Sequence, residues 1–242
     1  MRIDVIATAG EVQDSLVQGR LTIVIDVLRA TSTIVTALLN GCKGVAPVYD
    51  IEKAWEKANQ LGTELCLMGG ERNAVMIEGF QHGNSPLEYT RERVDNKYVI
   101  LTTTNGTKAI HHSKEASHIV AASFLNGQAV AEYAHKKYFG DVAVVCAGTE
   151  GKFSLDDFLC AGKLIHTLIN NSVDVTLNDL GIAAENLYKN NRGNLHDVLK
   201  KSFHYARLYS LGFQKDVEYC MQEDICSIVP VYTDELIVVN NE

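Results

Sequence analysis

Apolar runs along the chain end in polar or glycine-rich turns, and segments with helical periodicity follow most of them. The apolar runs predict strands at 22–27, 44–49, 64–70, 97–102, 118–123 and 141–148. Helical spacing predicts helices at about 31–39, 51–61, 127–138 and 155–169. Continuous apolar strands that alternate with helices are typical of a largely parallel sheet covered on both faces, so we expect a three-layer α/β/α fold.

The pattern changes after residue 174, where the strand-like runs disappear. Segments 179–190, 195–213 and 216–223 predict helices, and 227–240 predicts a final β-hairpin. Residues 73–97 show little periodicity, so we expect a long ordered loop with short elements, a feature that is usually functional inside a compact protein. We expect a single unit over residues 1–242, which a lobe boundary near residue 97 would divide into two α/β lobes.

Polar side chains gather where the predicted strands end. In chain order they are Asp26, Arg29, Glu71, Arg72, the segment 102–107, Ser123, Asn126, Asp156 and Asp157. In open α/β sheets, ligands bind beyond the carboxyl ends of the strands. Because several polar clusters fall at that one edge, the sequence predicts an assembled binding site there.

The segment "TTTNGT" at 102–107 lies between a predicted strand and a predicted helix. The hydroxyl groups of Thr104 and Thr107, the amide of Asn105 and the unpaired N–H groups of a helix N-terminus suit a bound anion. Gly106 lacks the Cβ atom that would block close approach. In the simpler interpretation, Thr104 or Asn105 only caps the helix.

Composition and charge narrow the choice of ligand. Apolar residues make up 46% of the chain and charged residues 21%, and the net charge of -8 argues against a nucleic-acid or anionic-membrane surface. An acidic protein that binds an anion must supply positive potential locally, from arginine, backbone N–H groups or a cation. No signal-peptide core, transmembrane-length run or CxxC pair occurs, so we expect a cytoplasmic protein with reduced thiols.

Familiar phosphate-binding motifs are mostly absent. Neither GxxxxGKS/T nor GxGxxG occurs in the chain, which removes support for nucleotide folds of those kinds. Cys66 and Arg72 have the spacing of a cysteine-phosphatase loop. Cys66 lies inside the apolar run "LCLM", however, so we interpret it as a core residue and keep a cysteine-dependent phosphatase as an alternative hypothesis.

Six blocks in this order, "DVLRATSTI", "GGER", "GFQHGNSPLE", "TTTNGT", "CAG" and "FSLDD", together with the tail that contains His204, Asp216 and Pro230, resemble the 2-phosphosulfolactate phosphatase family. The resemblance covers nearly the whole chain. It implies an α/β/α fold of its own kind and a magnesium-dependent phosphatase that converts 2-phosphosulfolactate to sulfolactate, a step toward coenzyme M. One departure is the pair Asn73–Ala74, which stands where glycine is common.

A substrate with phosphate, sulfonate and carboxylate groups needs strong charge compensation in an acidic protein, so we expect both Mg²⁺ and arginines in the site. Mg²⁺ prefers oxygen ligands and keeps several waters, so two or three carboxylates suffice. We expect Asp26, Asp156 and Asp157 to hold it, with Glu71 and Glu88 in reserve. Of the adjacent aspartates, one would bind metal while the other caps the helix or orients a water.

For substrate binding we expect Arg29 and Arg72, whose two-pronged geometry suits oxyanions, although each would serve equally well in a structural ion pair. Asn84 and Ser85 would add side-chain donors, or form an ordinary turn. The binding candidates are completed by the 104–107 segment described above.

For catalysis we expect metal-assisted attack of water, with Asp26 or Asp157 orienting the water and His204 protonating the leaving alkoxide. An aspartyl-phosphate on Asp26 stays open, as does a purely structural role for His204. A protein that binds a phosphorylated acid without turnover is the alternative from a different functional class. The C-terminal helices, rich in Tyr and Leu, offer a surface for a homodimer.

Overall fold

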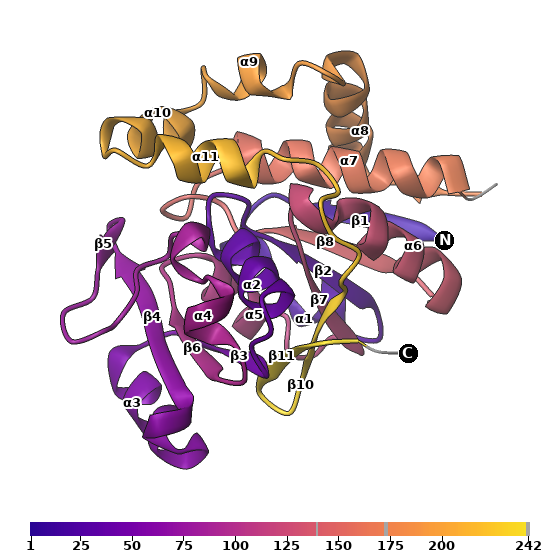
Figure 1. Cartoon of the computed structure of the whole chain (residues 1–242). Helices are drawn as coiled ribbons and strands as arrows, with labels where there is room; N and C mark the ends of the chain where they lie inside the picture. Colours follow the sequence, from indigo (N-terminus) through magenta and orange to yellow (C-terminus); the bar gives the residue numbers. More distant parts are fainter. Residues whose placement is uncertain (139, 172–173, 241–242) are drawn as a thin grey trace.

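The computed structural model describes residues 1–138, 140–171 and 174–240 and contains one mixed β-sheet of eleven strands (Figure 1). The strands are β1 Arg2–Ile6, β2 Leu21–Ile25, β3 Gly44–Val48, β4 Cys66–Arg72, β5 Val75–Met76, β6 Tyr98–Thr102, β7 His118–Ala122, β8 Val142–Cys146, β9 Thr176–Leu177, β10 Pro230–Thr233 and β11 Leu236–Val239. Their order across the sheet is β5-β4-β6-β3-β11-β10-β7-β2-β8-β1-β9. The α/β class with a largely parallel sheet is confirmed.

The C-terminal hairpin β10–β11 lies inside the sheet rather than at its edge. Strands β4, β6 and β3 form one parallel group, and β7, β2, β8, β1 and β9 form another. The hairpin joins them, with β11 antiparallel to β3 and β10 antiparallel to β7. The hairpin at 227–240 was predicted, but its position as the link between two parallel groups was not. Residue 97 is the expected lobe boundary. Strand β6, which begins directly after it, pairs with β3 and β4, which both precede it in the chain.

Helices cover both faces of the sheet. The longer helices are α2 Ala30–Leu39, α3 Ile51–Leu61, α5 Gly106–His112, α6 Gly127–Lys137, α7 Leu155–Asn171 and α8 Asp179–Asn191, and the shorter ones are α1 Asp14–Val17 and α4 Arg91–Val94. Helices α6 and α7 bury Val130 and Leu164 with one face of β1, β2 and β8. Helices α2 and α5 cover the opposite face, and α3 covers the far end of the sheet.

The region after α8 is helical, as expected, with α9 Leu195–Leu199, α10 Phe203–Ser210 and α11 Gln214–Cys220 on one side of the molecule (Figure 1). The predicted helix over 195–213 is two helices, because the Ser202 hydroxyl accepts a hydrogen bond from Tyr205 N and starts α10. The prediction that strands end at residue 174 is wrong by one short strand, β9. Among the described residues, no helix is long and apolar enough to cross a membrane.

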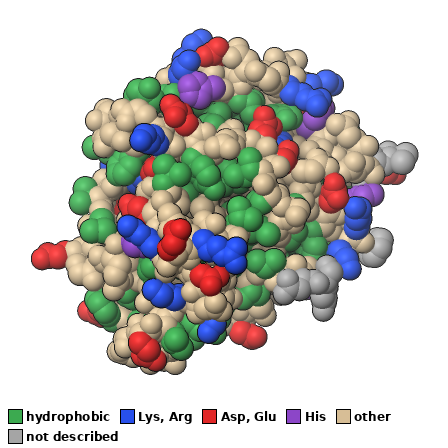
Figure 2. All heavy atoms as spheres, in the orientation of Figure 1, with side chains coloured by type: hydrophobic (Ala, Val, Ile, Leu, Met, Phe, Trp, Pro, Cys, Tyr) green, Lys and Arg blue, Asp and Glu red, His purple; other side chains and the backbone are tan. Residues whose placement is uncertain are grey.

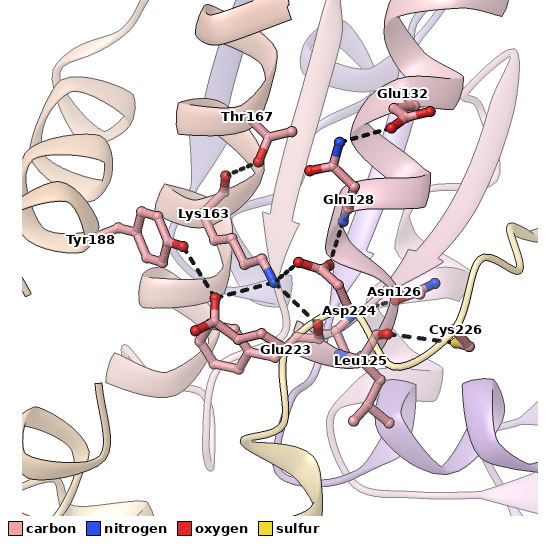
Figure 3. Close-up of polar contacts among 12 residues, drawn as sticks. Leu125, Asn126, Gln128, Glu132, Lys163, Thr167, Tyr188, Glu223, Asp224 and Cys226 are labelled. Carbon is pink, nitrogen blue, oxygen red and sulfur yellow. Dashed lines mark hydrogen bonds and ion pairs between the residues drawn. The ribbon is translucent and has the colours of Figure 1, made fainter. Parts of the chain in front are cut away.

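Polar contacts fix the chain between α11 and the hairpin. The Lys163 ammonium on α7 lies 2.7 Å from Asp224 Oδ2 and 3.2 Å from Glu223 Oε2 (Figure 3). Asp224 also accepts a hydrogen bond from Gln128 N, and Glu223 accepts one from the Tyr188 hydroxyl. We call these five residues the Lys163 cluster. On the face seen in Figure 2, basic side chains are interspersed with acidic ones.

Candidate active site

A small cavity of about 50 Å³ lies where β2, β4, β6 and β8 end, next to α10. The predicted site residues that line it are Asp26, Arg29, Glu71, Asn84, Thr104, Asn105 and His204. They come from segments that are far apart in sequence, so the fold brings them to one place. We call this cavity the pocket.

Asp26 follows β2 and caps helix α2. Its Oδ1 accepts a hydrogen bond from Ala30 N at 3.1 Å, and its carbonyl oxygen accepts bonds from the Thr31 N–H and hydroxyl. A Cβ atom on Gly106 would lie 2.8 Å from Asp26 Oδ2 and 2.6 Å from the Ala30 Cβ. Gly106 is therefore required because helix α5 begins directly against the Asp26 carboxylate.

The charge on Asp26 is held in an unfavourable environment. Burial raises the pKa of Asp26 to about 6, and the nearby carboxylates of Asp156 and Glu71 add to this, while His204 and Ala30 N–H work in the opposite direction. A buried group whose pKa is perturbed by specific neighbours in a cleft is a candidate for a functional site.

The adjacent aspartates at the start of α7 have different surroundings. Asp157 accepts hydrogen bonds from Val27 N at 2.8 Å and from Gly148 N at 3.0 Å, so it ties together the loops after β2 and β8. Burial raises the pKa of Asp157, and the charges of Asp156 and Asp26 raise it further. Both carboxylate oxygens of Asp157 are therefore occupied by backbone N–H groups that they hold in place.

Asp156 instead keeps one oxygen unused by the described chain. Its Oδ1 accepts a hydrogen bond from the Ser154 hydroxyl at 2.5 Å. Its Oδ2 is buried without a hydrogen-bond partner among the described residues and lies 3.6 Å from His204 Nδ1. Burial opposes ionisation, but the neighbouring imidazole outweighs it and lowers the pKa of Asp156.

His204 on α10 contacts the pocket from the side opposite the sheet. Its Nδ1 lies 2.9 Å from the Thr149 hydroxyl. Burial disfavours the protonated ring, but the carboxylates of Asp156 and Asp26 outweigh burial and raise the pKa of His204. The two carboxylates therefore favour the protonated form of His204.

Arg29 is held in place by the C-terminal region. Its guanidinium lies 2.5 Å from Asp216 Oδ2 and 4.0 Å from the centre of the Phe213 ring. Asp216 also accepts a hydrogen bond from the Ser85 hydroxyl at 2.7 Å. Ser85 therefore positions Arg29 through Asp216 and does not itself line the pocket.

Asn84 lies beside Ser85 and does line the pocket. Its carbonyl oxygen accepts a hydrogen bond from the Thr33 hydroxyl at 2.9 Å. Its side-chain Oδ1 is buried and has no hydrogen-bond partner among the described residues. A buried polar atom in this condition is rare in folded proteins and is consistent with a ligand contact.

Several polar groups of the 102–107 segment form hydrogen bonds with other groups of the chain. Glu71 Oε1 accepts bonds from both the N–H and the hydroxyl of Thr104, and Glu71 Oε2 accepts one from Ala74 N. The Thr107 hydroxyl donates to Thr103 O and lies inside the helix. Glu71 therefore anchors two turns, and Thr104 and Asn105 are the members of the segment that line the pocket.

Two predicted candidates, Arg72 and Glu88, lie elsewhere. Arg72 donates to Glu71 O and Tyr49 O and lines a separate cleft with Lys108. Because neighbouring residues of a strand point to opposite faces, Glu71 and Arg72 cannot both face the pocket. Glu88 accepts a hydrogen bond from Gly83 N in the preceding loop.

Cys66 starts β4 and Arg72 ends it. The strand has seven residues, a length of roughly 20 Å at about 3.3 Å per residue. Burial raises the pKa of the Cys66 thiol, and Glu64 adds to this. The two residues therefore do not form a cysteine-phosphatase loop. Cys66 is only partly buried and packs against the edge of the core cluster under α3, so it is not a full core residue.

The lining residues that were not predicted include Thr149, Glu150 and Arg207. Thr149 and Glu150 follow the "CAG" block, and their position directly after a predicted strand could have identified them as site residues. Arg207 lies on α10, and nothing in the helical pattern of that segment indicated a site residue.

The pocket fits Mg²⁺ only as a site that substrate and water would complete. Among the described residues, no three His, Cys, Asp or Glu side chains converge to hold a metal ion, so the four predicted carboxylates do not form one group. Asp26 and Asp156 suit the ion, because both are buried in the pocket region and Asp156 Oδ2 is unpaired. One or two carboxylates with substrate oxygens and water form a common arrangement for Mg²⁺.

Comparison with known proteins shows the family to which the chain belongs. Residues 6–235 match the model of the family described as 2-phosphosulpholactate phosphatase. The chain belongs to the 2-phosphosulpholactate phosphatase family. Membership of this family makes the protein a phosphoric monoester hydrolase, and it places the pocket residues within the matched region.

Relatives of this family share nearly the full length of the chain. A protein of Clostridium acetobutylicum is 44% identical over 97% of this chain and 98% of its own length. Proteins of Clostridium beijerinckii and Clostridium perfringens are 41% and 44% identical, over 97% and 95% of this chain and 98% and 92% of their own lengths. All three are named probable 2-phosphosulfolactate phosphatase.

Proposed function

We propose that the protein hydrolyses 2-phosphosulfolactate to sulfolactate and phosphate in a Mg²⁺-dependent reaction. The observation that carries the proposal is that Asp26, Arg29 and His204 line one pocket, and that the buried Asp156 Oδ2, which accepts no hydrogen bond from the described residues, lies 3.6 Å from His204 Nδ1. The names of the relatives support the substrate. A place in a route toward coenzyme M follows only if the sulfonate is recognised.

Each residue of the site has a separate role in the proposed hydrolysis. Bound Mg²⁺ would be held by Asp26 and Asp156 and would neutralise charge on the phosphoryl oxygens. Arg29, fixed by Asp216 and Phe213, donates N–H groups to the phosphate. Asp26 orients the water that attacks phosphorus.

As the bond between phosphorus and the ester oxygen breaks, protonated His204 donates a proton to the departing alkoxide. Asp156 supports this step because its carboxylate lies 3.6 Å from His204 Nδ1 and favours the protonated ring. Attack by Asp26 itself, which would give an aspartyl-phosphate, is the alternative for the first step. Hydrolysis of an ester whose phosphate is chiral through oxygen isotopes separates the two, since direct water attack inverts the configuration at phosphorus and the two-step route retains it.

The deciding experiment measures phosphate release from 2-phosphosulfolactate by the purified protein. We expect EDTA to abolish release, excess Mg²⁺ to restore it, and iodoacetamide to leave it unchanged. Glycerol 2-phosphate, which has hydroxyl groups in place of both acid groups, is the matched control substrate. Tight binding of 2-phosphosulfolactate without any turnover would instead support a sensor, and equal rates on both esters would remove the sulfonate-specific assignment.

A further inference from the structure

Each cationic side chain that lines the pocket faces a carboxylate in the free protein. The pairs are Arg29 with Asp216, His204 with Asp156, and Arg207 with Glu150. A multiply charged anion cannot enter such a pocket without displacing negative charge. The three pairs differ in how readily they release a carboxylate.

Glu150 is the carboxylate that can leave. The side chains of Asp216 and Asp156 are 6% and 1% exposed, and moving either one would break a buried ion pair. The Glu150 side chain is 48% exposed and its partner Arg207 is 27% exposed, so their ion pair is weak and water can replace it. Arg207 is therefore the cation in the pocket that is available for exchange.

The backbone at Glu150 supports this interpretation. Glu150 and Gly151 have φ values of 53° and 73°, and Thr149 and Lys152 exchange backbone hydrogen bonds of 2.8 and 3.0 Å. This is a type I′ turn, in which Asn, Asp or Gly is preferred at the first central position. Glutamate is a poor choice for this turn, which indicates that its carboxylate has a role of its own.

The pocket is small in the free protein. Its volume of about 50 Å³ holds only a few water molecules, since one water needs roughly 10–15 Å³ measured in the same way. Opening a charged contact in its lining would give a three-carbon ester with three anionic groups more room. The exposed pair of Glu150 and Arg207 is the charged contact that can open at little cost.

We propose that Arg207 binds an acid group of the substrate next to the phosphate, and that Glu150 occupies Arg207 in the free protein until that group replaces it. The proposal rests on the proposed function. A guanidinium group can bind sulfonate or carboxylate through two parallel N–H bonds, whereas Arg207 contacts Glu150 through Nη1. When Glu150 moves into solvent, the pocket gains space and loses a negative charge, while Arg29 stays available for the phosphate.

The first test measures equilibrium binding of sulfolactate by calorimetry in the presence of Mg²⁺, which needs no turnover. We expect Arg207→Gln to raise Kd about tenfold or more, because a charge-assisted contact is lost. Glu150→Asn should lower Kd several-fold, because it removes the competing carboxylate and suits the turn. Lys152→Gln is the matched control, since it removes a charge from the same turn outside the pocket, and its Kd should stay within about twofold of wild type.

The opposite pattern would overturn the proposal. Unchanged binding in Arg207→Gln, weaker binding in Glu150→Asn, or no binding of sulfolactate by the wild-type protein would each do so. Melting temperatures of the three variants, which we expect close to that of wild type, show whether a lost affinity reflects an unfolded protein.

The second test uses the substrate pair. For 2-phosphosulfolactate, Arg207→Gln should raise KM about tenfold and leave kcat nearly unchanged. For glycerol 2-phosphate, which lacks both acid groups, the same variant should have the KM of wild type. An equal loss on both esters would assign Arg207 a structural role and sink the proposal. If no ester is hydrolysed, the proposed function fails, while sulfolactate binding still decides the role of Arg207.

Discussion

The protein contains two polar clusters of opposite character, the pocket and the Lys163 cluster. In the Lys163 cluster, the ammonium group meets two carboxylates, and these also accept bonds from Gln128 N and the Tyr188 hydroxyl (Figure 3). At the pocket, Asp156 Oδ2 and Asn84 Oδ1 are buried without hydrogen-bond partners among the described residues. The Lys163 cluster is complete within the chain, whereas we propose that a ligand completes the pocket.

This difference teaches how the same residue types serve stability or function. A polar network with all its groups paired holds elements together, and here it fixes the segment that leads to the central hairpin. A network with unpaired atoms costs stability unless something binds to it. The fold bears that cost at the pocket, where Asp26 has a pKa raised to about 6. Substitutions in the pocket should therefore lower activity without lowering stability, whereas substitutions in the Lys163 cluster should lower stability and leave activity unchanged.

The largest effect on activity should come from Asp26→Asn. We expect kcat to fall about a hundredfold or more, because a charge that acts on the reacting phosphate is removed. The melting temperature should stay the same or rise, because a buried charge among other carboxylates is neutralised. Steady-state kinetics and scanning calorimetry on the same preparation measure both. Activity within tenfold of wild type would refute the role of Asp26.

The largest effect on stability should come from Lys163→Met. This change keeps the length of the side chain and leaves Glu223 and Asp224 without their cation. Since both carboxylates are about one-third exposed, we expect a loss of about 2 kcal/mol, or a melting temperature lower by about 4–8 °C. The kcat of the folded protein at 25 °C should not change.

Lys200→Met is the matched control for that change. Lys200 pairs with Asp197 on the surface, and its removal should leave the melting temperature unchanged. If Lys163→Met also lowered kcat tenfold, the Lys163 cluster would belong to the function, and the contrast between the two clusters would be lost.

Sequence patterns predicted the fold well where local periodicity decides it. The strand and helix alternation and the final hairpin follow from residue spacing. Strand β1 was missed because Asp4 interrupts its apolar run; that carboxylate is buried, and Arg20 Nη1 binds it at 2.6 Å. The position of the hairpin between β3 and β7 depends on pairing between distant segments, which no local pattern reports.

The site was predicted in part for the same reason. Polar residues at strand ends identified Asp26, Arg29 and Asn105, because strand ends share one edge of the sheet. Arg72 was misplaced because strand alternation turns it away from Glu71. Arg207 was missed because a helix packed from the far end of the chain delivers it, and helical spacing carries no information about that contact.

A moderate effect should follow from Asn84→Ala. We expect kcat/KM to fall about tenfold, because a group that faces the ligand is lost. The melting temperature should not fall, since the amide oxygen has no partner to lose within the described chain. Thr22→Val is the matched control, because Thr22 Oγ1 is also buried and unpaired but lies in β2 away from the pocket. That variant should be at least as stable as wild type and keep its kinetics, whereas equal kinetic losses in both would show that unpaired atoms do not identify the ligand site.

The smallest effect should come from the turn that joins β4 to β5. Asn73 and Ala74 have φ values of 56° and 66°, in a two-residue hairpin where glycine is preferred at the second position. Ala74→Gly relieves the left-handed alanine but loses a partly buried methyl group, so we expect a gain of about 0.5 kcal/mol, or about 1–2 °C in melting temperature. Because glycine keeps the N–H that donates to Glu71 Oε2, the wall of the pocket and therefore KM should not change. Ala74 itself lines the pocket, so a raised KM would show that its methyl group contacts the substrate.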